Sequence, residues 1–198
     1  MRKNLLHVGC GSSSIKDLKG FNQKTWGEIR FDIDIAASPD ILGTLTDMSQ
    51  VETNSIDAIY SSHNIEHLFA HEVPQAFSEF FRVLRDDGFL VLTCPDLQSV
   101  CAAVANDNLL GTLYQAPIGP IAAIDILYGE RSYLQGGKIY MAHKCGFTYS
   151  VLTGLLSQAG FKGFYGGARP ECYDLWTVAF KQNKQNSEVE AIALSFLP

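Results

Sequence analysis

A short apolar strand that breaks into a glycine turn constrains the fold of this chain more than any other feature. Residues 5–8 read Leu-Leu-His-Val, and Gly9, Cys10 and Gly11 follow at once. A strand that ends in Gly-x-Gly lets the backbone approach a ligand closely and offers free N–H groups to its polar part. Folds of the α/β class hold nucleotide-like cofactors in this way, although glycines also simply form turns. The turn predicts an α/β fold with a ligand site after the first strand.

An acidic residue at the end of the next apolar run strengthens this prediction. Asp32 closes that run and lies about twenty residues beyond the glycine turn. At this spacing a carboxylate meets the ribose hydroxyls of a bound cofactor. Asp34 is the alternative for this role, and both aspartates could instead be solvated residues that only close a strand. The two signals together predict a cofactor that contains a ribose.

Composition narrows the class of protein. The 198 residues are 46% hydrophobic and 18% charged, which is ordinary for one globular domain. The net charge of −6 and the absence of a basic run argue against binding to duplex nucleic acid. The sequence contains no stretch of eighteen apolar residues, the length that would predict a membrane span. Its first residues lead directly into a strand and lack the pattern of a signal peptide, so we expect none there. The five scattered cysteines are typical of reduced thiols, so we expect a cytoplasmic protein.

Strand and helix patterns alternate along the chain, as in a doubly wound sheet. Apolar spacing predicts an amphipathic helix that begins at Val73, with Pro74 in its first turn and Gly88 as its stop. A second helix runs from Thr148, its N-cap, to Gly160. The glycines after the first strand leave room only for a short first helix. The predicted strands cover residues 28–34, 57–61, 89–93, 161–165 and 175–180, with an edge segment near 41–45.

Two segments stand apart from this pattern. Residues 100–140 are rich in Ala, Leu and Ile but are interrupted by Pro117, Gly119 and Pro120. We expect them to form a cap or insertion over the mouth of the cofactor site that determines substrate specificity. Residues 183–198 begin as a polar stretch and are expected to form a C-terminal tail. Residues 1–182 are therefore expected to form a single domain.

Several short motifs follow one another along the chain. They are LHVGCGS at 6–12, FDID at 31–34, NSIDAIYSSHNIEHL at 54–68, RVLRDDGFLVLTCPD at 82–96, HKCGFT at 143–148 and AGF at 159–161. In this order they resemble the class I S-adenosylmethionine-dependent methyltransferases, in particular a small branch of the type 11 kind. The resemblance covers most of residues 4–165, except 100–140.

This resemblance implies an α/β fold with a doubly wound, mostly parallel seven-stranded sheet and helices on both faces. It also implies S-adenosyl-L-methionine as the cofactor and methyl transfer to a small-molecule or glycan-linked acceptor. Carried over position by position, the family's cofactor-binding residues are His7, Gly9, Cys10, Gly11, Asp32, Ile33, Leu45, Asp47, Ser61 and Ser62.

Histidines supply the candidate catalytic groups. His63 follows the fourth strand and is the best candidate for a general base toward the acceptor, with His143 as a second candidate or a wall of the site. His63, His67 and His71 recur every four residues with Glu66 beside them, which on a helix would align metal ligands. Pro74 disfavours a helix there, so we expect no metal site.

Two other functions stay open. Three departures from the family pattern, His7, Ser13 and Thr44, favour a non-catalytic binding or scaffold protein on the same fold. A nicotinamide-dependent reductase would use the same glycine turn. Its fingerprint needs a third glycine at the start of a helix, where this chain has Ser14.

Overall fold

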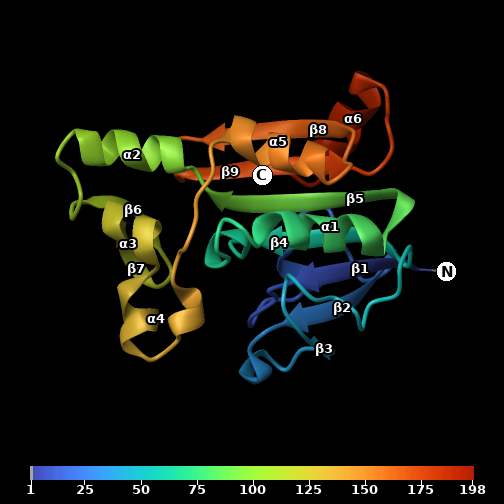
Figure 1. Ribbon diagram of the computed structural model, residues 1–198, viewed down its shortest axis with the longest axis horizontal. Helices are drawn as coiled ribbons and strands as arrows, with labels where there is room; N and C mark the ends of the chain where they lie inside the picture. The colour runs from blue at the N-terminus through green and yellow to red at the C-terminus, as the bar shows by residue number, and fades with distance from the viewer. Residues whose placement is uncertain (1) are drawn as a thin grey trace.

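Seven strands form one sheet in the order β3-β2-β1-β4-β5-β9-β8 in the computed structural model, which describes residues 2–198 (Figure 1). Only β9 runs antiparallel to the other six strands. This is the mostly parallel, doubly wound sheet that the sequence predicts. The strands are β1 (Lys3–Val8), β2 (Trp26–Asp32), β3 (Ile41–Leu42), β4 (Ile56–Ser62), β5 (Leu84–Pro95), β8 (Gly163–Arg169) and β9 (Asp174–Phe180).

One face of the sheet is covered by two amphipathic helices. Helix α1 (Val73–Val83) has Pro74 in its first turn, and α5 (Tyr149–Gln158) is capped by Thr148, whose hydroxyl accepts a hydrogen bond from the Val151 N–H. Their apolar sides pack with Leu6 and Val8 of β1 in the larger core. The structure confirms the sequence prediction for both helix starts.

The other face carries less helix. A single 3-10 turn, η1 (Ile15–Asp17), follows the glycine turn, as the short first connection predicts. The C-terminal helix α6 (Asn186–Ala193) also packs on this face, and Phe196 beyond it lies against Phe21 and Phe89. Residues 183–198 therefore differ from the expected polar tail, because Val189, Ala193 and Phe196 are buried.

The end of α1 also differs from the sequence prediction. The helix ends at Val83 and β5 begins at Leu84, so Gly88 lies inside β5 and does not stop the helix. Leu84 is buried and pairs with Ile56 of β4, and the register shifts before Phe89 pairs with Ala58. The tertiary pairing of Leu84 ends the helix early, and the exposed residues 85–87 and Gly88 take up the irregularity.

Residues 97–143 form a separate lobe beyond the carboxyl ends of the parallel strands (Figure 1). This lobe has its own small core, in which Val100, Ile121, Ala123 and Ile126 are buried. Its elements are α2 (Leu97–Ala105), the hairpin of β6 (Thr112–Ala116) and β7 (Gly119–Ala122), α3 (Ala123–Tyr128), α4 (Arg131–Gln135) and the 3-10 turn η4 (Ile139–Met141).

Two further 3-10 turns follow strands of the sheet, η2 (Ile35–Ala37) after β2 and η3 (Ile65–His67) after β4. The turn η3 has the short form that Pro74 predicts for this segment. Across residues 2–198, no helix is long and apolar enough to cross a membrane.

Candidate active site

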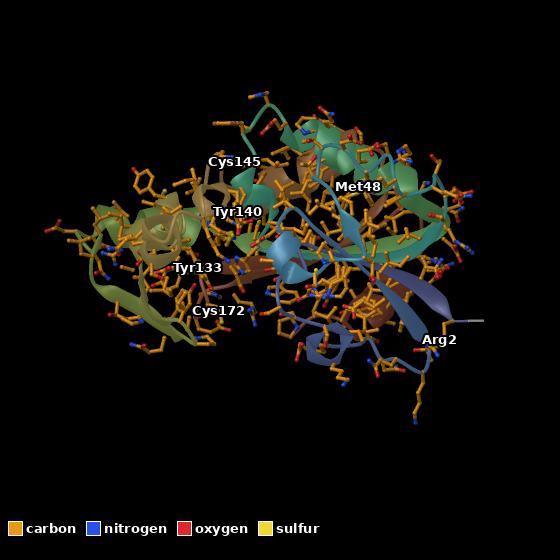
Figure 2. All side chains as sticks on the ribbon, turned by 90° about the horizontal axis from the view of Figure 1, so that it is seen from below. Arg2, Met48, Tyr133, Tyr140, Cys145 and Cys172 are labelled. Carbon is orange, nitrogen blue, oxygen red and sulfur yellow. The ribbon has the colours of Figure 1, made fainter. Side chains whose placement is uncertain are left out.

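A cavity of about 920 Å³ opens where the carboxyl ends of β1, β2 and β4 meet the lobe. Its volume is within the range of small-molecule and cofactor sites. The glycine turn, the end of β2 and the loop after β4 line one side, and Tyr133, Lys138, Tyr140 and Met141 of the lobe line the other. In Figure 2, Tyr133 and Tyr140 are labelled on the side of the lobe that faces the sheet. This is the edge of an open α/β sheet where ligands bind.

The glycine turn is held against the loop after β4. Gly9 and Gly11 have φ angles of +61° and +50°, in the left-handed region that favours glycine. A Cβ on Gly9 would lie 1.8 Å from the side-chain oxygen of Asn64. The Asn64 amide donates hydrogen bonds to the carbonyl oxygens of Val8 (2.9 Å) and Ser62 (3.0 Å). Gly9 is therefore needed both for backbone conformation and for the close approach of Asn64.

Asp32 is oriented by the backbone around it. Its Oδ2 accepts a hydrogen bond from the Gly11 N–H and its Oδ1 accepts one from the Asp34 N–H, both at 2.8 Å. The residue is only 7% exposed, yet it lines the cavity. Each carboxylate oxygen has two acceptor sites, so each retains acceptor capacity for a ligand. The two carboxylate oxygens of Asp32 are therefore held as hydrogen-bond acceptors in a fixed position at the end of β2.

Asp34 connects the sheet to the lobe. Its Oδ2 accepts a hydrogen bond from the Tyr140 hydroxyl at 2.7 Å and lies 3.6 Å from the Lys138 ammonium. The Tyr140 hydroxyl, followed by the Ala36 N–H, lowers the pKa of Asp34, and the Asp34 carboxylate in turn raises the pKa of Tyr140. Asp34 is therefore occupied by lobe residues, whereas Asp32 faces the cavity without a lobe partner among residues 2–198.

Apolar side chains flank the cavity beside Asp32. Ile33 is 55% exposed although it is a large aliphatic residue, and Leu45 lines the same region. Together they form an apolar border that suits a planar ring. Asp47 lies outside the cavity lining, because its carboxylate accepts a hydrogen bond from the Ser49 N–H at 3.0 Å and stabilises the turn there.

His63 faces the cavity from the loop after β4. It has a φ of +53°, which is uncommon for a residue other than glycine, and its side chain is 45% exposed. Its Nδ1 lies 3.3 Å from Oε1 of Glu66, a residue only 1% exposed. Burial acts to lower the pKa of His63, but the Glu66 carboxylate outweighs this and raises it above its usual value. A buried carboxylate therefore lies beside the ring.

Gly9, Cys10, Gly11, Asp32, Ile33, Leu45, Ser62 and His63 all line the cavity, and thus the structure brings together most of the residues that the sequence suggests. His7 and Ser61 do not. His7 points to the opposite face of β1, where its Nδ1 lies 2.7 Å from Oε1 of Glu28, and Ser61 is fully buried beside the Asn64 amide. Alternation of side chains along a strand explains both positions.

His143 lies behind the main cavity and not in its wall. It borders a smaller cavity of about 230 Å³, and its Nδ1 lies 2.6 Å from the carbonyl oxygen of Ile126. Its ring centroid is 5.0 Å from that of His67. Burial lowers the pKa of His143. Because His143 does not line the main cavity, the arrangement does not support the expected contact of His143 with a reacting acceptor.

Sequence reasoning missed several residues that line the cavity, namely Arg30, Asn64, Lys138 and Tyr140. Asn64 and Arg30 flank the motifs at short range, and Arg30 donates to the Gly11 carbonyl oxygen at 2.6 Å. Their nearness to the glycine turn and Asp32 was the available signal. Lys138 and Tyr140 reach the site only through the fold of the lobe, for which the sequence has no periodic pattern.

Comparison with known proteins agrees with this geometry. Residues 6–92 match the family model described as "Methyltransferase domain". The match covers less than half of the chain, and residues 6–92 are similar to methyltransferase domains of the type 11 family. The match and the sheet topology agree with the predicted resemblance to the S-adenosylmethionine-dependent methyltransferases. The sequence has no significant match among curated proteins.

Solved structures share the fold at low sequence identity. The citrinin polyketide synthase CMeT domain is 16% identical with a TM-score of 0.60, and the match covers 92% of this chain and 47% of that one. This chain thus spans about half the length of that structure. A Pyrococcus horikoshii protein is 14% identical with a TM-score of 0.62, over 92% and 83% of the two chains. A Methanosarcina mazei SAM-dependent methyltransferase is 18% identical with a TM-score of 0.57, over 90% and 91%.

Proposed function

We propose that this methyltransferase binds S-adenosyl-L-methionine in the 920 Å³ cavity and transfers its methyl group to a small-molecule or glycan-linked acceptor. The observation that carries the proposal is the position of Asp32. Its carboxylate is held by the Gly11 and Asp34 N–H groups and lines the cavity beside the glycine turn. Two carboxylate oxygens fixed in this way can each accept a hydrogen bond from one of the two hydroxyls of a ribose.

The position of the ribose determines where the other parts of the cofactor would lie. Gly9 and Gly11 allow the methionine part to lie against the backbone of the turn, where side chains would obstruct it. Ile33 and Leu45 provide apolar contact for the adenine ring at the other end. The sulfonium would then lie toward Ser62 and His63, at the carboxyl end of β4.

His63 is the residue that we assign to the acceptor. S-adenosylmethionine supplies an activated methyl group, and an acceptor lone pair displaces its sulfur to leave S-adenosylhomocysteine. For a hydroxyl acceptor, the proton leaves to a base. The Glu66 carboxylate near Nδ1 of His63 favours a proton on that nitrogen, which leaves the lone pair of Nε2 available. For a carboxylate or sulfur acceptor, alignment alone suffices.

The lobe supplies the acceptor side of the cavity. Tyr133, Tyr140 and Met141 offer aromatic and thioether surface, and Lys138 and Lys144 add positive charge at the rim. This combination suits an acceptor with an apolar body and an acidic or hydroxylated end. We propose that residues 97–143 act as the cap that selects the acceptor.

Two observations bear on the alternative functions. His7, one of the three departures that favour a non-catalytic protein, points away from the cavity toward Glu28 and therefore does not alter the lining. Ser14 is followed by η1, a turn of three residues, so a pyrophosphate would meet no helix N-terminus there. Both observations favour a methyltransferase over a scaffold or a reductase.

Calorimetric titration of the full chain with S-adenosylhomocysteine, and separately with NADH, tests the cofactor. We expect one equivalent of S-adenosylhomocysteine to bind and NADH not to bind. Binding of NADH alone would overturn the proposal in favour of a reductase. Acceptors are then screened by the transfer of labelled methyl from S-adenosylmethionine into pools of hydroxylated and acidic metabolites or glycans. Binding without transfer to any pool would favour the scaffold.

A further inference from the structure

Glu66 is a buried carboxylate without a hydrogen bond. It is 1% exposed, and neither Oε1 nor Oε2 has a hydrogen-bond partner in the part of the chain that the structure describes. His63 approaches Oε1 to 3.3 Å. Lys144 contacts Glu66 through its backbone N–H, and its ammonium lies over the Phe69 ring, 4.9 Å from the ring centroid. Buried carboxylates are ordinarily paired with a cation or bind a metal.

Two imidazoles lie beside this carboxylate. One ligand atom each of Glu66, His67 and His143 can be chosen so that all three lie within 4.8 Å of one another. His67 comes with Glu66 from η3, and His143 comes from the end of the lobe. The two segments are joined by the backbone, because the Lys144 N–H donates to the Glu66 carbonyl oxygen at 2.8 Å. The group therefore belongs to the packed fold.

The hydrogen bonds of the two rings set their tautomers. Nδ1 of His67 lies 3.2 Å from the Ala142 carbonyl oxygen, and Nδ1 of His143 lies 2.6 Å from that of Ile126. A carbonyl oxygen only accepts, so each Nδ1 must carry the proton. In a neutral imidazole this leaves the lone pair on Nε2. Histidines that ligate metals are commonly held in this way, with the other ring N–H donated to a backbone carbonyl.

We propose that Glu66, His67 and His143 bind one divalent transition-metal ion of the zinc class. Two imidazole nitrogens and one carboxylate oxygen suit Zn²⁺, Fe²⁺ or Co²⁺ better than Mg²⁺, which prefers oxygen ligands. Tetrahedral bonds of about 2.1 Å place ligand atoms about 3.4 Å apart, so small side-chain rotations close the site. The fourth position is open to water.

The predicted ligand set differs from the one that the sequence spacing suggests. His71 is not part of it, since its ring stacks on Phe69 with centroids 5.8 Å apart. His143 replaces it from 72 positions further along the chain, beyond the reach of any short motif. An ion at this place would join η3 to the end of the lobe. Both the main cavity, which His67 lines, and the smaller cavity, which His143 lines, border the site.

Calorimetric titration of the chelator-treated full chain with ZnCl₂ and with MgCl₂ tests the inference. We expect one equivalent of Zn²⁺ to bind and to raise the melting temperature, and Mg²⁺ to do neither. Glu66→Gln and His143→Gln should each weaken Zn²⁺ binding by about tenfold or more. His71→Gln removes an exposed histidine outside the cluster and should bind Zn²⁺ as the wild type does.

Three results would overturn the inference. They are no Zn²⁺ binding by the wild type, binding unaffected by Glu66→Gln and His143→Gln, and equal weakening by His71→Gln. Far-UV circular dichroism checks the fold of each variant, and the wild-type titration decides the question even if a variant does not fold. S-adenosylhomocysteine binding is measured on the same chelator-treated sample, so failure of the metal site and failure of the proposed function are distinguished.

Discussion

Replacement of Asp32 by alanine is the sharpest test of where the cofactor binds. In the proposed complex the carboxylate accepts one hydrogen bond from each ribose hydroxyl. Charge-assisted bonds of this kind contribute about 1.5–3 kcal/mol each. Loss of both corresponds to about 3–6 kcal/mol, and since 1.4 kcal/mol is a factor of ten, the affinity should fall by about 10²- to 10⁴-fold. Loss of a single bond sets a floor of about tenfold.

The same substitution also releases the glycine turn. The N–H groups of Gly11 and Asp34 each lose an acceptor at 2.8 Å, which makes the turn less ordered before binding. Both groups lie at the cavity, where water replaces the carboxylate, so the fold should survive. Calorimetry with S-adenosylhomocysteine measures the affinity, and a thermal melt of the same sample measures stability.

Two control variants separate the possible causes. Asp87→Ala removes an exposed carboxylate on β5 and should leave the affinity unchanged. Asp34→Ala breaks the contact with Tyr140 but keeps the Asp32 carboxylate that accepts from the ribose. The affinity should therefore fall much less than in Asp32→Ala. Equal titration curves for Asp32→Ala and the wild type would refute the reasoning. A large loss of S-adenosylhomocysteine affinity in Asp34→Ala but not in Asp32→Ala would assign the ribose contact to Asp34 instead.

Three further predictions follow from the contacts of the site. Tyr140→Phe removes the 2.7 Å hydrogen bond to Asp34, so amide hydrogen exchange in residues 131–142 should become faster; unchanged exchange would show that this contact does not hold the lobe. His63→Ala should lower the rate of the chemical step by about 10²- to 10⁴-fold while S-adenosylhomocysteine affinity stays nearly constant, and full turnover would exclude a base role. Burial lowers the pKa of His7 from 6.5, with Glu28 partly offsetting it. The unfolded chain therefore binds a proton first as the pH falls below 6.5, and the free energy of unfolding should decrease. His7→Gln should reduce that decrease in urea titrations between about pH 5 and 7, and an identical pH slope in the variant would contradict the assignment.

The sheet and its ligand edge could be predicted because they depend on short-range patterns. Buried apolar runs such as residues 5–8 and 89–93 indicate parallel strands, and the carboxyl ends of such strands meet at one edge. Polar residues just after these strands, Gly9, Asp32 and His63, therefore meet in space without any knowledge of the packing. Sequence order alone was enough for this part of the site.

The direction of individual side chains was harder to predict. Leu6 and Val8 point into the larger core, so the residue between them, His7, must face the other side of β1. Alternation predicts this once the core face is known, but both faces of this central strand are buried and the pattern does not distinguish them. Ser61 on β4 shows the same ambiguity, because it is fully buried beside Asn64.

The internal fold of the lobe and its contacts with the sheet could not be predicted, because these contacts join residues that are far apart in the sequence. Tyr140 and Asp34 are 106 residues apart, and His143 reaches Glu66 and His67 only after the chain has passed through the whole lobe. Neither contact leaves a periodic trace, since each depends on a single polar side chain. The residues that select the acceptor therefore lie where sequence reasoning is weakest.

Two of the links between the lobe and the sheet should act together. Tyr140 meets Asp34 at the end of β2, and three residues later His143 meets the η3 turn after β4. Only Met141 and Ala142 separate these two contacts, so movement of one displaces the other. An ion at Glu66, His67 and His143 would thus favour the closed contact of Tyr140 as well. Zn²⁺ should slow amide exchange in residues 131–142, and this slowing should be smaller in Glu66→Gln than in His71→Gln.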